Sequence, residues 1–172
     1  METMKYSPSE TIQHFKNIKA LYDVDIRNCL SPIGDLYLNE GGDISFNNTE
    51  TVINLDCIER FLIRKQDRIG NNTMDFTFII NNSSKELVLA DFKLNTLPKS
   101  RLQSINKSRI ENKILNSVNS FSLNMPVHAD KYLIFRKEIV PVAVSRINRQ
   151  YHNRKHNIKS NDINEFYNLF FS

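Results

Sequence analysis

Two apolar runs in the middle of the chain are rich in β-branched and aromatic residues, MDFTFII at residues 74–80 and ELVLADFKLN at residues 86–95. The connection between them, residues 81–85, is polar. Runs of this composition around a short polar connection are typical of two antiparallel strands joined in a hairpin. The sequence therefore predicts a hairpin in this region.

Apolar residues at helical spacing predict four helices. The first has the clearest start, because Ser7 is a favoured N-cap, Pro8 suits the first helical position and Glu10 completes a capping box. The four predicted segments are residues 7–22, 54–66, 100–121 and 161–171.

Three other segments read as strands. Residues 35–46 contain two short alternating runs around the sequence NEGG, which predicts a second hairpin. Residues 131–137 and 139–147 are rich in apolar and β-branched residues and predict two further strands. Pro141 places the last strand at a sheet edge or marks its start, because proline cannot donate to a strand ladder.

These elements predict one α/β domain over residues 1–172, with a mixed central β-sheet flanked by helices. We expect its core over residues 54–147, with an N-terminal helix and hairpin in residues 7–46. A basic segment and a C-terminal helix follow in residues 146–172. The sequence contains no repeat or low-complexity tract that would argue for another organisation.

Composition changes this picture little. Hydrophobic residues make up 40% and charged residues 24% of the chain, which is ordinary for a globular protein. No apolar run approaches the ~20 residues that a membrane helix needs, and the N-terminus lacks the apolar core of a signal peptide. Cys29 and Cys57 have neither a metal-ligand spacing nor a disulfide framework. We therefore expect a reduced, cytoplasmic protein with structural cysteines and no membrane partner.

Charge is unevenly distributed along the chain, whose net charge is +4. Residues 1–100 carry 11 Lys and Arg against 14 Asp and Glu, whereas residues 101–172 carry 12 against 5. A basic half beside an acidic half suggests a polyanionic partner, which the basic half binds and the acidic half acts on. An ordinary solvated basic face explains the same asymmetry equally well.

The end of the second run of the central hairpin places charge where a buried strand normally excludes it. Pairing Ile80 with Glu86 sets Asp75 directly opposite Asp91, and Lys93 follows on the same face of the strand. Side chains that face each other across a strand pair lie ~5 Å apart. Two carboxylates at this separation repel each other unless a cation lies between them, and oxygen ligands of this kind suit Mg²⁺. An adjacent lysine could orient or deprotonate an attacking water.

This arrangement resembles the PD-(D/E)xK nuclease superfamily, in which an Asp at the start of one strand precedes an Asp-x-Lys at the end of the next. The matching residues are Asp75 in MDFTFII, and Asp91 and Lys93 in VLADFK. Glu59 in CIERFLIRK matches the acidic residue that many members carry on the preceding helix. The family's proline before the first Asp is replaced here by Met74. The resemblance covers roughly half of the chain.

The resemblance implies a restriction-endonuclease-like core and a nuclease that depends on Mg²⁺, with Mn²⁺ as a substitute. It implies DNA in preference to RNA as the substrate. It assigns Asp75 and Asp91 as metal ligands, Lys93 as the catalytic lysine and Glu59 as an auxiliary ligand, with the Phe92 carbonyl joining the metal shell. A second match to the motif, at residues 111–113, lies in a helical pattern and is rejected as the catalytic motif.

Basic residues in the second half are the candidates for phosphate contacts, which fix position and affinity without reading bases. Lys113, on the helix that follows the Asp-Phe-Lys strand, is the favoured accessory residue. The full set is Arg101, Lys107, Lys113, Arg146, Arg149, Arg154 and Lys155. An aromatic cluster near the C-terminus, residues 166–171, predicts either core packing or a homodimer contact.

Two other readings stay open beside the nuclease. The same scaffold could be a non-catalytic module that binds nucleic acid or a protein partner, such as an inhibitor, immunity or assembly protein. Asp91 and Lys93 could also be an ordinary ion pair at a strand end. Metal-dependent turnover of nucleic acid separates the first reading from both alternatives.

Overall fold

The computed structural model describes residues 5–95, 105–150 and 157–172, and within them the strands form one six-stranded sheet in the order β1-β2-β3-β4-β5-β6. The first four strands are antiparallel to their neighbours, while β4 pairs with β5 and β5 with β6 in parallel. The strands are β1 (Leu30–Pro32), β2 (Thr51–Asn54), β3 (Phe76–Asn81), β4 (Lys85–Phe92), β5 (Asp130–Ile134) and β6 (Asn157–Asn161).

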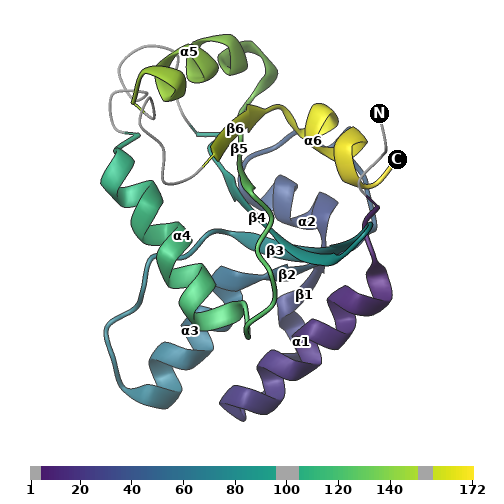
Figure 1. The fold of residues 1–172 in the computed structure, drawn as a ribbon, viewed down its shortest axis with the longest axis vertical. Coiled ribbons are helices and arrows are strands. Elements are labelled where there is room, and N and C mark those ends of the chain that lie inside the picture. Colours follow the sequence, from purple (N-terminus) through teal and green to yellow (C-terminus); the bar gives the residue numbers. More distant parts are fainter. Residues whose placement is uncertain (1–4, 96–104, 151–156) are drawn as a thin grey trace.

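Helices pack on both faces of the sheet, so the predicted mixed sheet flanked by helices is confirmed (Figure 1). They are α1 (Pro8–Tyr22), α2 (Ile33–Asn39), α3 (Leu55–Gln66), α4 (Lys107–Phe121), α5 (Val140–Gln150) and α6 (Ile163–Phe170). Two short 3₁₀ turns, η1 (Arg27–Cys29) and η3 (Lys137–Ile139), precede β1 and α5. No helix in the described part of the chain is long and apolar enough to cross a membrane.

The sheet separates two apolar clusters. Helices α1, α3, α4 and α5 contribute to one cluster, and α2 and α6 to the other. Successive residues of β3 and β4 enter opposite clusters; Phe78 and Ile80 lie on the α2 and α6 face, whereas Ile79 lies on the α3 and α4 face. Because both faces are covered, these strands read as continuous apolar runs rather than as alternating ones.

The predicted central hairpin and its register are confirmed, since Ile80 pairs with Glu86 and Phe76 with Ala90. The helices predicted at 7–22, 54–66 and 161–171 correspond to α1, α3 and α6, and the strand at 131–137 corresponds to β5. The helix predicted at 100–121 corresponds to α4, and residues 100–104 of that prediction lie outside the described residues. Asp162 caps α6 with a capping box. Phe166 and Phe170 of the aromatic cluster are buried in the core.

Two predicted elements are wrong. Residues 35–46 do not form a hairpin, because Ile33, Leu36 and Tyr37 follow helical spacing and bury one face of α2 against the sheet. Residues 139–147 form α5 instead of a strand, since Ala143 and Ile147 lie one turn apart and both face the core. The parallel strand beyond β5 is β6, which lies in the basic segment where no strand was predicted.

The expectation of reduced cysteines is also wrong. Cys29 and Cys57 form a disulfide whose Cα atoms are 5.4 Å apart, and the bond joins η1 to the first turn of α3. The two residues are 28 positions apart in sequence. Their contact arises from packing η1 against α3, which sequence spacing alone does not reveal.

We predict that reduction of this disulfide lowers the free energy of unfolding by about 3–4 kcal/mol, because the cross-link restricts the unfolded chain over a loop of this length. Urea denaturation with and without a dithiol reductant measures the change. Cys57→Ala serves as the control, since its denaturation midpoint should not respond to reductant. Two free thiols that react with a thiol reagent in the unreduced, unfolded wild type would contradict the prediction, because the disulfide would then be absent.

Candidate functional site

The residues that the sequence singled out meet at the open end of the β3–β4 hairpin. Asp75 immediately precedes β3, Asp91 is the last residue but one of β4, and Lys93 follows the end of β4. The side chain of Asp91 is completely buried, whereas those of Asp75 and Lys93 are 14% and 22% exposed. The structure thus places the acid pair and the lysine in one largely buried pocket.

The hairpin backbone fixes Asp75 in this position. The Asp75 amide donates to the Ala90 carbonyl at 3.1 Å, which continues the ladder one residue beyond Phe76. The Phe92 amide in turn donates to Asp75 Oδ2 at 2.6 Å. These two bonds hold Asp75 beside Asp91, as the register predicted.

Two ammonium groups neutralise the buried carboxylate of Asp91. Lys93 Nζ donates to Asp91 Oδ2, and Lys113 Nζ donates to Asp91 Oδ1 at 2.6 Å. Lys113 Nζ also lies 3.7 Å from Asp75 Oδ1. An unpaired charge at such a site costs several kcal/mol, so both lysines contribute to keeping Asp91 ionised.

Lys113 lies on α4, and the buried serine Ser117 anchors this helix next to the site. Ser117, one turn after Lys113, donates its hydroxyl to the Lys113 carbonyl at 2.8 Å. The same oxygen accepts from the Met74 amide at 2.8 Å, which ties the helix to the residue before Asp75. Lys113 was predicted as the accessory residue of this helix, and it lies among the acids rather than on an outer surface.

The protonation of the two acids differs sharply. Burial and the neighbouring charge of Asp91 raise the pKa of Asp75 well above its usual value. Burial also acts to raise the pKa of Asp91, but Lys93 and Lys113 outweigh it, and the pKa of Asp91 is lowered. A proton shared by the pair is therefore favoured on Asp75 over Asp91.

Asp56 is a third acid at this site, and the sequence analysis missed it. It lies in the first turn of α3, and its Oδ1 accepts from the Thr73 hydroxyl at 3.2 Å. Burial raises the pKa of Asp56, and the charge of Lys113 opposes that shift. The Leu55 amide donates to the Asp75 carbonyl at 2.9 Å, so the start of α3 abuts the acid pair. The sequence did contain a signal for Asp56, because it is an acid in the first turn of a helix that begins at a strand end.

Glu59, predicted as the auxiliary ligand, lies away from the acid pair. It is one helical turn beyond Asp56, and Arg68 contacts both of its carboxylate oxygens at 2.6 and 3.1 Å. The Asn71 amide also donates to it at 2.7 Å. The carboxylate of Glu59 therefore organises the loop after α3, and its role as an auxiliary ligand stays a prediction.

A cavity of about 120 Å³ opens beside the acids. Its lining includes Asp56 and Asp75 together with Glu40 at the end of α2. Burial raises the pKa of Glu40, and the charges of Asp56 and Asp91 raise it further. Three carboxylates thus line the cleft, and Arg60 adds a cation to its lining.

Three of the remaining predicted phosphate contacts lie in the described part of the chain, and none of these three lines the cleft. Lys107 is 4.0 Å from Glu111 on α4. Arg146 and Arg149 lie on α5, where the Arg149 guanidinium contacts Ser145. Arg101, Arg154 and Lys155 fall outside the described residues.

Within residues 5–95, 105–150 and 157–172, no group of three or more His, Cys, Asp or Glu side chains is placed to hold a metal ion. Mg²⁺ characteristically takes only one or two protein carboxylates and fills its shell with water and substrate phosphate. Asp75 and Asp91 would supply two carboxylates of this kind, and both oxygens of Asp91 already accept from ammonium groups.

No protein-family model, curated protein or solved structure matches the chain.

We predict that Asp75→Asn stabilises the protein at neutral pH by a few degrees in Tm. The amide mimics the protonated acid, because its oxygen can accept from the Phe92 amide and its NH₂ can donate to Asp91. A carboxyl whose pKa is raised on folding stabilises the native state below its unfolded pKa, and that stability is lost as pH rises through its folded pKa. Thermal melts across pH should therefore show that the Tm of the variant rises relative to the Tm of wild type as pH increases. Parallel pH profiles for the two proteins would contradict the raised pKa.

We also predict that Lys113→Met lowers the free energy of unfolding by about 2–4 kcal/mol, because it leaves one oxygen of buried Asp91 without a cation. The control is Lys85→Met, which removes the surface pair with Glu10 and should cost less than about 1 kcal/mol. Urea denaturation measures both. Equal losses in the two variants would show that Lys113 contributes no more than a surface lysine.

Proposed function

We propose that the acidic cleft at the open end of the hairpin is the active site of a metal-dependent nuclease that hydrolyses phosphodiester bonds, with DNA favoured over RNA. The observation that carries this proposal is the convergence of Asp75, Asp91 and Lys93 in one buried pocket. Two acids and a lysine at strand ends are the groups that the resemblance to PD-(D/E)xK nucleases assigns to catalysis. The succession of α3, β3, β4, α4 and β5 also follows the order of elements that the resemblance implies.

A cation in this pocket would compete with the proton of Asp75, because burial and then the charge of Asp91 raise the pKa of that carboxyl. An ion between the two acids would relieve the repulsion that contributes to this shift. Asp75 and Asp91 would hold Mg²⁺ or Mn²⁺, with the Phe92 carbonyl and Asp56 beside them. When bound, the ion would acidify a water and neutralise charge on the scissile phosphate.

The chain's own residues would then act on the water and the phosphate. Lys93 follows the end of β4 and is 22% exposed, so its ammonium can turn from Asp91 toward an attacking water or the developing negative charge. Lys113 is more deeply placed at 14% exposure and contacts both acids. We assign Lys113 to positioning the acid pair and Lys93 to contact with the reacting groups.

Cleavage assays with plasmid, single-stranded DNA and RNA, with and without Mg²⁺ or Mn²⁺, test this proposal. We expect Lys93→Ala and Asp91→Asn each to lower the rate by at least about a hundredfold, because general acid–base groups and metal ligands contribute on that scale. Circular dichroism checks that both variants fold. Asp25→Asn is the matched control, since Asp25 is an exposed acid that pairs with Arg27 and does not line the cleft, and its rate should equal that of wild type.

Metal-dependent cleavage that persists in both active-site variants would remove the proposed mechanism. Cleavage that is independent of added metal and sensitive to Lys93→Ala would retain the site and remove the cation.

A non-catalytic binding module on the same scaffold is the second candidate, and the pairing of Asp91 favours it. Both oxygens of this carboxylate already accept from an ammonium group. A neutralised cluster of this kind can serve as a structural ion-pair network that stabilises the fold without chemistry. This candidate predicts binding of nucleic acid or a protein without turnover in any of the assays above.

A further inference from the structure

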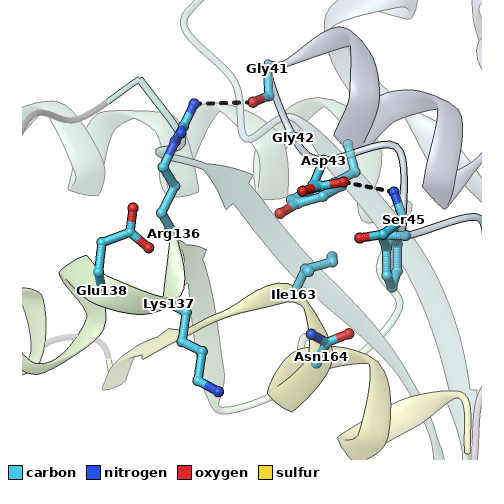
Figure 2. Close-up of a pocket in the computed structure, with 11 residues that line it drawn as sticks. Gly41, Gly42, Asp43, Ser45, Arg136, Lys137, Glu138, Ile163 and Asn164 are labelled. Atoms are coloured by element: carbon cyan, nitrogen blue, oxygen red, sulfur yellow. Dashed lines mark hydrogen bonds between the residues drawn. The ribbon is translucent and has the colours of Figure 1, made fainter.

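A second and larger hollow of about 590 Å³ lies at the same end of the sheet as the acidic cleft. Three segments build it: the loop after α2, the segment from the end of β5 into η3, and the first turn of α6 (Figure 2). Its volume is within the range of pockets that enclose small organic ligands. The nuclease chemistry proposed above does not use it.

Arg136 joins this hollow to the acidic cleft. Its Nε donates to the Leu94 carbonyl at 2.8 Å, one residue beyond Lys93. One of its terminal nitrogens contacts the Gly41 carbonyl at 3.3 Å, one residue beyond Glu40. Glu40 lines the cleft, whereas Gly41 lines the hollow, so the two spaces lie on either side of the turn that ends α2.

The two sides of the hollow carry different chemistry. Figure 2 shows Arg136, Lys137 and Glu138 on one side and Asp43 and Ser45 on the other. The first side carries two cations against one acid, which suits an anionic group such as a phosphate. The second side offers a carboxylate and a hydroxyl, which suit the hydroxyl and amino groups of a sugar or base.

An apolar floor completes the hollow between these two sides. Ile163 and Phe46 both line it, and both are largely buried, at 4% and 8% exposure. Flat apolar or aromatic surfaces of this kind pack against the faces of nucleobases, which contributes affinity without base specificity. One space of nucleotide size thus offers cations for an anionic group, polar groups for hydrogen bonds and an apolar surface.

We infer that this hollow is a subsite for one nucleotide of the substrate strand, next to the phosphate that enters the acidic cleft. The nucleotide's phosphate lies at Arg136 and Lys137, and its sugar or base lies toward Asp43 and Ser45. The inference rests on the proposed nuclease function for the identity of the strand, and on the connection through Arg136 for the strand's path.

Equilibrium binding tests the subsite separately from catalysis. The probe is a short fluorescein-labelled single-stranded oligonucleotide, titrated with the protein in EDTA and followed by fluorescence anisotropy. Lys137→Glu reverses a charge on the cationic side, and Ser45→Trp fills the hollow from the opposite side. Arg136 is left intact because it holds the backbone at Leu94 and Gly41.

We expect each of the two variants to raise the Kd by about tenfold, the scale of losing one phosphate or stacking contact. Lys16→Glu on α1 is the matched control for charge, since it changes the net charge equally at an exposed site away from the hollow. Its Kd should stay within about twofold of wild type, because a change in net charge alone acts weakly at that distance. Equal losses in Lys137→Glu and Lys16→Glu would overturn the subsite.

Two further measurements separate the possible outcomes. A free nucleoside monophosphate should compete with the oligonucleotide for wild type and compete more weakly for Lys137→Glu. If the monophosphate binds and the oligonucleotide does not, the hollow takes a free nucleotide and the substrate-strand assignment is wrong. In cleavage assays, Ser45→Trp should raise KM and leave kcat unchanged, whereas Lys93→Ala should lower kcat and leave the Kd unchanged.

The same measurements distinguish failure of the subsite from failure of the nuclease. Oligonucleotide binding that weakens in both hollow variants, in a protein that cleaves nothing, would keep the subsite and remove the proposed enzyme. Cleavage by wild type with unchanged Kd and KM in both hollow variants would remove the subsite and keep the enzyme.

Discussion

Asp91 carries a negative charge at a position with no exposure to solvent, and the surrounding structure is organised to satisfy it. Lys93 reaches it from the same strand, and Lys113 reaches it from α4. Burial and the charge of Asp91 raise the pKa of Asp75 on the neighbouring strand. A buried carboxylate of this kind costs stability unless cations and hydrogen bonds surround it, and here two ammonium groups do so.

The sheet topology explains why this charge lies at one end of the sheet. β4 changes from an antiparallel neighbour, β3, to a parallel neighbour, β5, and Asp91 lies in the last part of β4. The Lys93 amide donates to the Ile134 carbonyl at 2.7 Å, so β4 and β5 end together at one edge. Three further segments meet at this end of the sheet: the turn after α2, the first turn of α3 and the segment after β5. One end of the sheet therefore holds both the acidic cleft and the larger hollow connected to it by Arg136.

Local sequence patterns were sufficient where burial enforces a simple period. The central hairpin, its register and three of the helices follow directly from apolar spacing, and the pairing of Asp75 with Asp91 follows from that register. The patterns failed at α2 and α5, whose short apolar sets fit a strand as well as a helix. There the packing of Leu36 and Tyr37, and of Ala143 and Ile147, decided the conformation.

The sequence by itself determined the hairpin and which acids face each other across it, because a period of two leaves no freedom once one pair is set. Only the tertiary structure decided which other groups join them. Four features depend on contacts between segments far apart in the chain: Asp56 in the cleft, Lys113 as a second cation, the disulfide between Cys29 and Cys57, and the hollow beside Arg136. Such contacts follow from how helices dock on the sheet, and no local spacing records that docking.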